Sequence, residues 1–87
     1  MRTTIENVRK ATKAALDIAK KEGLKRIAIP PLGTGVGGVN KLDAARVMVE
    51  EVKNYPDMEI ILIDLFDDGV EAFIQALNEK GIPYKRG

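Results

Sequence analysis

The chain has 87 residues, of which 45% are hydrophobic and 31% are charged, so it can form one small domain and no more. Its formal net charge of +1 argues against a nucleic-acid partner held by bulk electrostatic attraction. Cysteine and histidine are both absent, which excludes disulfides and thiolate chemistry and removes the commonest general base and metal ligand. We therefore predict no metal site and no bound cofactor.

The sequence also bears on where the protein resides. No apolar run at the N-terminus resembles a signal peptide. The longest apolar stretch, Ile60–Ile63, is too short to cross a bilayer. A chain without cysteine is by default intracellular, so we expect a cytoplasmic protein without a membrane partner.

The first predicted element is a helix from about Thr4 to Glu22. Thr3 and Glu6 have the spacing of a capping box, in which each side chain bonds a free amide at the helix start. Gly23 follows at the position where left-handed backbone is commonly found. Small and apolar side chains recur on one face, which predicts a surface helix with one buried stripe: Ile5, Val8, Thr12, Ala15, Leu16 and Ala19.

Two short strands are predicted, Lys25–Pro30 and Glu59–Leu65, and each contains an unbroken apolar run. Such runs favour strands that are buried on both faces, as in a parallel sheet. Between them we predict a helix from about Lys41 to Asn54, with Asn40 as its N-cap. Strand, helix and strand then form a right-handed parallel crossover.

The last predicted helix begins with Asp68 and Glu71 and ends at Gly81, and the tail Ile82–Tyr84 is a candidate edge strand. The second and third helices each show one apolar stripe: Leu42, Ala45, Met48, Val49 and Val52 in the second, and Val70, Phe73, Ile74 and Leu77 in the third.

The predicted fold class is therefore α/β, with the order helix, strand, helix, strand, helix in a single partial domain over residues 1–87. A sheet of two strands is marginal by itself and has two open edges. We expect a second copy to complete this sheet, so that the protein is a homo-oligomer, most simply a two-fold dimer.

The sharpest sequence feature is the segment between the first strand and the second helix. It contains Gly33, Gly35, Gly37 and Gly38, whose backbone can approach a ligand closely and aim successive amides at an anion. The helix that follows adds its positive end. The alternative is a flexible turn, but ligands of open α/β sheets bind at the carboxyl ends of the strands, which is where this loop lies.

Two nucleotide-binding motifs fit this loop poorly. Gly33, Gly35 and Gly38 satisfy G-x-G-x-x-G, but the nearest acidic residues of the next strand, Asp64 and Asp67, come too late for a dinucleotide-binding unit. A Walker A loop requires Lys-Ser/Thr after its last glycine, and here Val39-Asn40 follow.

The loop and its flanks resemble the macro domain family instead. The resemblance is carried by Ile27-Ala28-Ile29-Pro30-Pro31-Leu32-Gly33-Thr34-Gly35-Val36-Gly37-Gly38 and by the helix that starts Asp43-Ala44-Ala45-Arg46. The later strand and the helix with Phe73 fit as well. It implies an α-β-α-β-α fragment of a three-layer sandwich, equivalent to the C-terminal half of that family's fold.

The resemblance also implies a ligand, ADP-ribose or a related nucleotide diphosphate. By position, the amides of Thr34, Gly35, Val36 and Gly37, within the loop Gly33–Gly38, would wrap the diphosphate and distal ribose. Many members of the family carry an aromatic residue where this chain has Gly37. Phe66 matches approximately the place of an aromatic that stacks on adenine, the alternative being an apolar core or edge residue. Asp64 and Asp67 are interpreted as turn or capping residues.

No residue can be assigned a catalytic role. In the hydrolytic branches of the family an asparagine followed by a glycine run carries the chemistry, and no asparagine here is followed by one. The leading hypothesis is therefore weak or partner-dependent binding of ADP-ribose. The alternatives are half of a split ADP-ribosyl hydrolase completed by another chain, and a truncated or engineered oligomeric fragment without a ligand.

Overall fold

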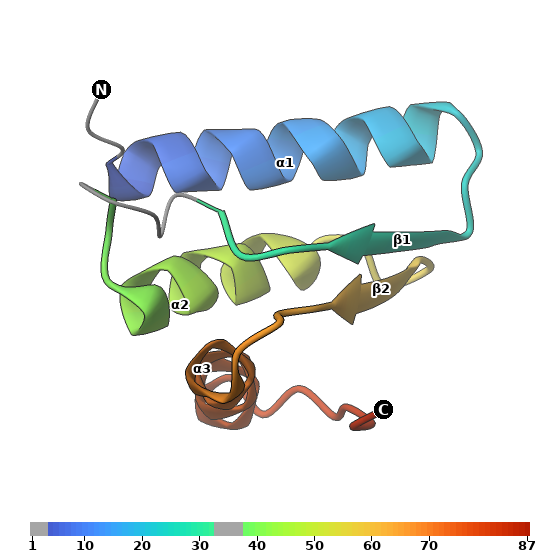
Figure 1. Ribbon diagram of the computed structural model, residues 1–87. Helices are drawn as coiled ribbons and strands as arrows, with labels where there is room; N and C mark the ends of the chain where they lie inside the picture. Colours follow the sequence, from blue (N-terminus) through green and yellow to red (C-terminus); the bar gives the residue numbers. More distant parts are fainter. Residues whose placement is uncertain (1–3, 33–37) are drawn as a thin grey trace.

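The computed structural model describes residues 4–32 and 38–87 and has the predicted order of elements. Within these residues the chain forms three helices and two parallel strands, whose arrangement is shown in Figure 1. Their bounds are α1 Ile5–Lys21, β1 Arg26–Ile29, α2 Lys41–Val52, β2 Glu59–Leu62 and α3 Asp67–Glu79. The α/β class and the parallel arrangement of the strands are confirmed.

The first two helices begin and end where side-chain chemistry places their boundaries. At α1 the N-cap is Thr4, whose hydroxyl accepts a hydrogen bond from the Asn7 amide at 3.1 Å. The predicted cap, Thr3, is therefore wrong by one residue, because the Thr4 hydroxyl takes this role; Thr3 itself lies outside the described residues. Gly23 adopts φ 73° just beyond the helix, as predicted. The α2 N-cap is Asn40, whose side chain accepts from two backbone amides.

The start of α3 differs from the prediction. The helix begins at Asp67 rather than at Asp68, and Phe66 is its N-cap residue without any side-chain cap bond. The physical reason is that Asp68 is engaged elsewhere, because its carboxylate accepts a hydrogen bond from Lys41 of α2. The chain can therefore turn into the helix one residue earlier.

The strands pair in parallel, with Arg26 opposite Glu59 and Ile29 opposite Leu62. Both strands are shorter than predicted, because Pro30 cannot donate to the ladder and ends β1. A further bond from the Ile63 amide to the Ile29 carbonyl, at 3.1 Å, continues the contact beyond β2. The side chains of Arg26 and Glu59 form an ion pair at the other end of the sheet.

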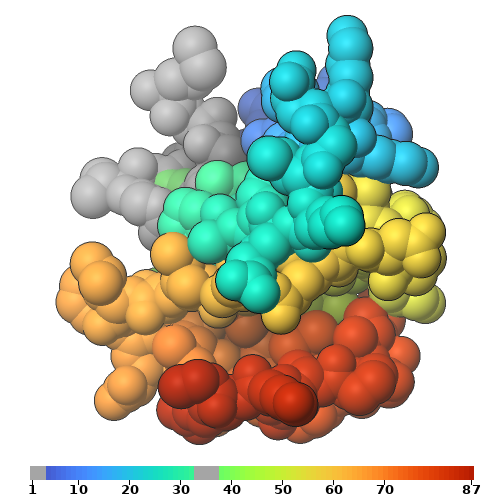
Figure 2. Space-filling view, turned by 90° about the vertical axis from the view of Figure 1, so that its right-hand side faces the viewer, coloured from blue at the N-terminus to red at the C-terminus, as the bar shows by residue number. Residues whose placement is uncertain are grey.

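The helices lie on one side of the sheet. In Figure 1 the strands pass in front of α2, and α2 packs between α1 and α3. Figure 2 turns the end with the α1–β1 connection toward the viewer, where β1 (teal) is visible at the surface. The C-terminal residues (red) lie along the lower edge of this view.

This arrangement overturns the prediction that the strands are buried on both faces. The side chains of Ile29 and, in part, Ile27 face the helices, whereas Ala28 is exposed. Ile61 and Ile63, on the same open face of the sheet as Ala28, are 41% and 47% exposed. The second helical layer of a three-layer sandwich is not present in the described parts of the chain, so apolar side chains remain uncovered.

The core is centred on α2, which is buried over more of its circumference than the predicted stripe. Ala44 and Val47 are buried in addition to the predicted Ala45, Met48 and Val49. The cause is that α2 contacts a helix on each side as well as the sheet. The core residues are Val8, Leu16, Ile29, Ala44, Ala45, Val47, Met48, Val49, Tyr55, Phe73, Ala76 and Leu77.

Polar groups at the margin of this core are paired. Tyr55, in the turn after α2, is buried and its hydroxyl donates to the Asp17 carboxylate of α1. This bond raises the pKa of Tyr55 to about 12. The buried Glu51 accepts from Arg9 of α1 at 2.9 Å, and Arg9 also binds Glu50. No buried side-chain polar atom within 4–32 and 38–87 lacks a hydrogen-bond partner.

The C-terminal tail does not form the predicted edge strand. Residues 82–87 have no strand structure. Ile82 instead donates its amide to the Leu77 carbonyl and packs its side chain against the core. The reason is that α3 ends at Glu79 and Gly81, at φ 66°, turns the chain back onto the helix. None of the helices that the structure describes is long and apolar enough to span a membrane.

Candidate functional site

The carboxyl ends of both strands lead into the starts of α2 and α3. Asn40 caps α2 by accepting from the amides of Leu42 and Asp43 at 2.8 and 3.2 Å. Gly38 is exposed two residues earlier. The predicted ligand loop, Gly33, Thr34, Gly35, Val36 and Gly37, lies outside the described residues. The structure describes the residues that flank this loop on either side.

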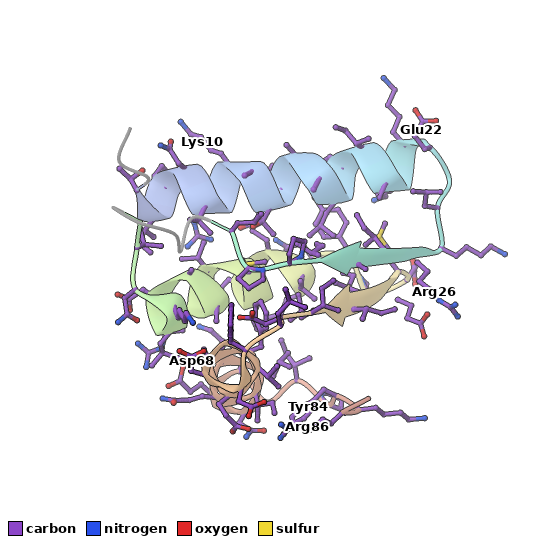
Figure 3. All side chains as sticks on the ribbon, in the orientation of Figure 1. Lys10, Glu22, Arg26, Asp68, Tyr84 and Arg86 are labelled. Carbon is purple, nitrogen blue, oxygen red and sulfur yellow. The ribbon has the colours of Figure 1, made fainter. Side chains whose placement is uncertain are left out.

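The start of α2 and the start of α3 are joined by a salt bridge. The Lys41 ammonium donates to the Asp68 carboxylate at 2.8 Å, across 27 positions of the sequence. This bond lowers the pKa of Asp68, and nearby backbone amides act in the same direction. Figure 3 shows Asp68 on the side of α3 that faces α2. The bridge therefore fixes the two helix starts relative to each other.

Phe66 is an exposed aromatic residue at this end of the sheet. Its side chain is 66% exposed, so it is not a core residue. The Lys41 ammonium lies 5.6 Å from the centre of its ring, within the range of a cation–π contact. A phenyl ring that is exposed beside the carboxyl ends of parallel strands is available for stacking by a flat ligand.

Asp64 is a turn residue, as interpreted from the sequence. Its carboxylate accepts from the Phe66 amide at 3.1 Å, directly before α3. It also occupies the space that a side chain at Gly69 would need, because a Cβ built there would lie 1.4 Å from Asp64 Oδ2. Gly69 is buried beneath it in the first turn of the helix. Asp64 therefore fixes the backbone that presents Phe66.

Phe66 is a predicted site residue, whereas Lys41 is not. A signal was present, since a cation in the first turn of a helix opposes the helix dipole and needs a local reason. The structure supplies that reason as the carboxylate of Asp68 and the ring of Phe66. Both partners belong to the β2–α3 segment, which the sequence alone does not place beside α2.

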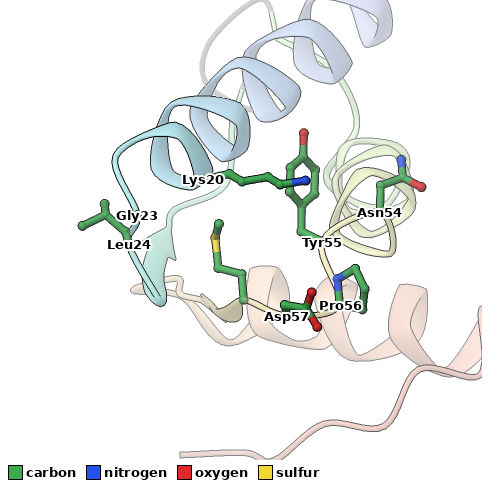
Figure 4. A pocket seen from close by; sticks show the side chains of 8 residues that line it. Lys20, Gly23, Leu24, Asn54, Tyr55, Pro56 and Asp57 are labelled. Atoms are coloured by element: carbon green, nitrogen blue, oxygen red, sulfur yellow. The ribbon is translucent and has the colours of Figure 1, made fainter.

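A separate small cavity lies at the opposite end of the strands, between the α1–β1 and α2–β2 turns. Figure 4 shows Lys20 reaching toward Tyr55 across this cavity. Its volume is about 160 Å³, and its lining residues are Lys20, Gly23, Leu24, Asn54, Tyr55, Pro56, Asp57 and Met58. Pockets for cofactors and drug-sized ligands have about 300 Å³ or more, so this cavity does not fit a nucleotide.

Groups of three or more potential metal-binding side chains do not occur in the part of the chain that the structure describes.

Comparison with known proteins places these features in a family. Residues 1–48 match the macro domain, a span that contains β1, the glycine loop and two thirds of α2. An uncharacterized protein of Aquifex aeolicus is 49% identical over 80 residues, which cover 88% of this chain and 48% of that protein. An uncharacterized protein of Aeropyrum pernix is 41% identical over 46 residues, covering 53% of this chain and 24% of that protein.

The chain thus spans about half the length of the Aquifex relative and about a quarter of the Aeropyrum relative. The family match extends over 48 of the 87 residues, more than half of the sequence. This chain belongs to the macro domain family.

Proposed function

We propose that this protein binds ADP-ribose or a related nucleotide diphosphate through the loop Gly33–Gly38, weakly or with the help of a partner. The observation that carries the proposal is the family match, which runs through the loop and into α2. Glycines allow the backbone to approach phosphate oxygens closely and to aim amides at them. The loop also connects the carboxyl end of a strand to a helix, which is where open α/β sheets bind their ligands.

The described residues around the loop support an anion at this place. Asn40 satisfies two amides of the first turn of α2, so these two amides are not free for a ligand and an anion would be held by the loop amides ahead of them. Its dipole favours negative charge just ahead of it, where Gly38 is exposed. Phe66 offers a stacking surface for the base of the same ligand.

Calorimetric titration with ADP-ribose, ADP and inorganic phosphate tests the proposal. We expect heat of binding with ADP-ribose and a loss of at least tenfold in affinity in Gly35→Val, because a β-branched side chain disfavours positive φ and blocks close approach. Gly87→Val is the matched control, since Gly87 has no atom within 4 Å of an added Cβ. A folded wild-type protein that gives no heat with any of the three ligands at millimolar concentration would refute the proposal.

A second candidate function is half of a split ADP-ribosyl hydrolase. It is favoured by the Aquifex relative, slightly more than half of which has no match in this chain. No asparagine in this sequence precedes a glycine run, so we expect the isolated chain to have no hydrolase activity. Adding the unmatched segment of the Aquifex relative should restore turnover of an ADP-ribosylated protein. Turnover by the isolated chain that is lost in Gly35→Val would contradict this assignment.

A further inference from the structure

Two charged side chains and one aromatic ring connect the starts of α2 and α3. Lys41 is the first residue of α2, and Asp68 is the second residue of α3. The Lys41 ammonium is held by the Asp68 carboxylate at 2.8 Å and lies 5.6 Å from the ring centre of Phe66. One cation therefore binds both a carboxylate and a ring that come from a different part of the sequence.

We propose that the Lys41–Asp68 pair positions Phe66 as a one-sided stacking platform, and so sets a preference for ligands that carry an aromatic base. This inference rests on the proposed function. The ring is 66% exposed, and the ammonium is placed over it. A flat ligand can then stack only on the face that the ammonium leaves free.

The order of the Phe66 side chain in the free protein affects the free energy of ligand binding. An exposed phenylalanine side chain that samples several rotamers must be immobilised when a ligand stacks on it, which reduces affinity. Contact with an ammonium, itself held by Asp68, restricts the ring before the ligand arrives. Asp64 contributes by holding the Phe66 amide at 3.1 Å. Preorganisation of this kind strengthens only those ligands that use the ring.

A direct phosphate contact is the competing role for Lys41. The two roles predict opposite effects of removing the Asp68 charge. If Lys41 binds phosphate, Asp68→Asn frees the ammonium and should strengthen binding. If the pair positions Phe66, the same substitution loosens the ring and should weaken binding of a base-carrying ligand.

The experiment compares ADP-ribose with two base-free ligands, ribose 5-phosphate and pyrophosphate, by calorimetry. We expect Lys41→Met and Asp68→Asn each to weaken ADP-ribose binding about two- to fivefold, the range of an exposed cation–π contact, and to leave the base-free ligands unchanged. Lys41→Arg should retain wild-type affinity, because guanidinium both stacks on rings and binds carboxylate. Glu59→Gln is the control, since its ion pair with Arg26 lies at the opposite end of the sheet (Figure 3).

Equal weakening of ADP-ribose and pyrophosphate by Lys41→Met, or tighter ADP-ribose binding by Asp68→Asn, would overturn the inference and leave the proposed function intact. A wild-type protein that binds neither kind of ligand would overturn both. Aromatic NMR of the free protein supplies a readout without ligand. The Phe66 ring signals should move toward averaged values in Lys41→Met, and unchanged signals would again contradict the positioning role.

Discussion

Gly69 shows how one residue at this end of the sheet is fixed by its surroundings. An alanine in the first turn of α3 would place its Cβ against the Asp64 carboxylate, 1.4 Å from Oδ2 and 2.4 Å from Cγ. The carboxylate would have to rotate away and lose its bond to the Phe66 amide. We expect Gly69→Ala to lower the free energy of unfolding by about 1 kcal/mol, measured by urea denaturation.

A double-mutant cycle separates this steric effect from helix propensity. In an Asp64→Ala background the carboxylate is gone and only the Cβ of residue 64, 3.1 Å from a Cβ built at Gly69, remains close. The cost of Gly69→Ala should therefore fall when the Asp64 carboxylate is removed first, because the gain in helix propensity, up to about 1 kcal/mol, then opposes only this smaller contact. If Gly69→Ala lowers the free energy of unfolding equally in both backgrounds, the Asp64 carboxylate does not lie against Gly69 in solution.

At the scale of elements, α2 and α3 are joined by an ion pair with two hydrogen bonds. Arg46 donates to both carboxylate oxygens of Glu79, at 2.8 and 2.9 Å, and lowers the pKa of Glu79 from 4.5 to about 2. Between these values the folded state holds fewer protons on Glu79 than the unfolded state does. This contribution to stability is therefore complete above about pH 4.5 and is lost as the pH falls toward 2.

Glu79→Gln should weaken the fall in unfolding free energy between pH 4.5 and 2, measured by urea denaturation at constant ionic strength. The effect should be modest, because the pair is partly exposed. Arg46→Met should produce the same weaker dependence, since it returns the Glu79 pKa toward its ordinary value. Parallel curves for the wild type and both variants would argue that the pair does not form.

At the scale of the whole molecule, the open face of the sheet supports the expectation of a homodimer. Ile61 and Ile63 are 41% and 47% exposed on this face, and β1 and β2 pair only with each other within 4–32 and 38–87. We propose that a second copy covers this surface, and light scattering at micromolar concentration should give a dimer mass. Ile61→Lys should shift the protein to monomer. Ile18→Lys is the control and should not, because Ile18 is also an exposed apolar residue, at 62%, but lies on α1 and not on the open face of the sheet. A monomeric wild type with a cooperative thermal transition would contradict this proposal.

The sequence alone determined the order and type of the elements. The start of α2 and the end of α1 followed from local chemistry, because a cap such as Asn40 and a left-handed residue such as Gly23 act within a few positions of the chain. The parallel crossover followed from two apolar strands around one helix. The family resemblance likewise rested on contiguous residues, and the match over residues 1–48 confirms it.

Only the tertiary structure decided which surfaces are covered. An apolar run does not reveal whether one or both faces of a strand will meet a partner, so the exposure of Ile61 could not be predicted. From the sequence alone, Glu51 would be interpreted as a solvent-exposed residue. It is buried because its carboxylate pairs with Arg9 of α1. Lys41 and Asp68 are likewise joined by the packing of α3 against α2. Periodicity records preferences along the chain, whereas these pairings depend on contacts between residues distant in sequence.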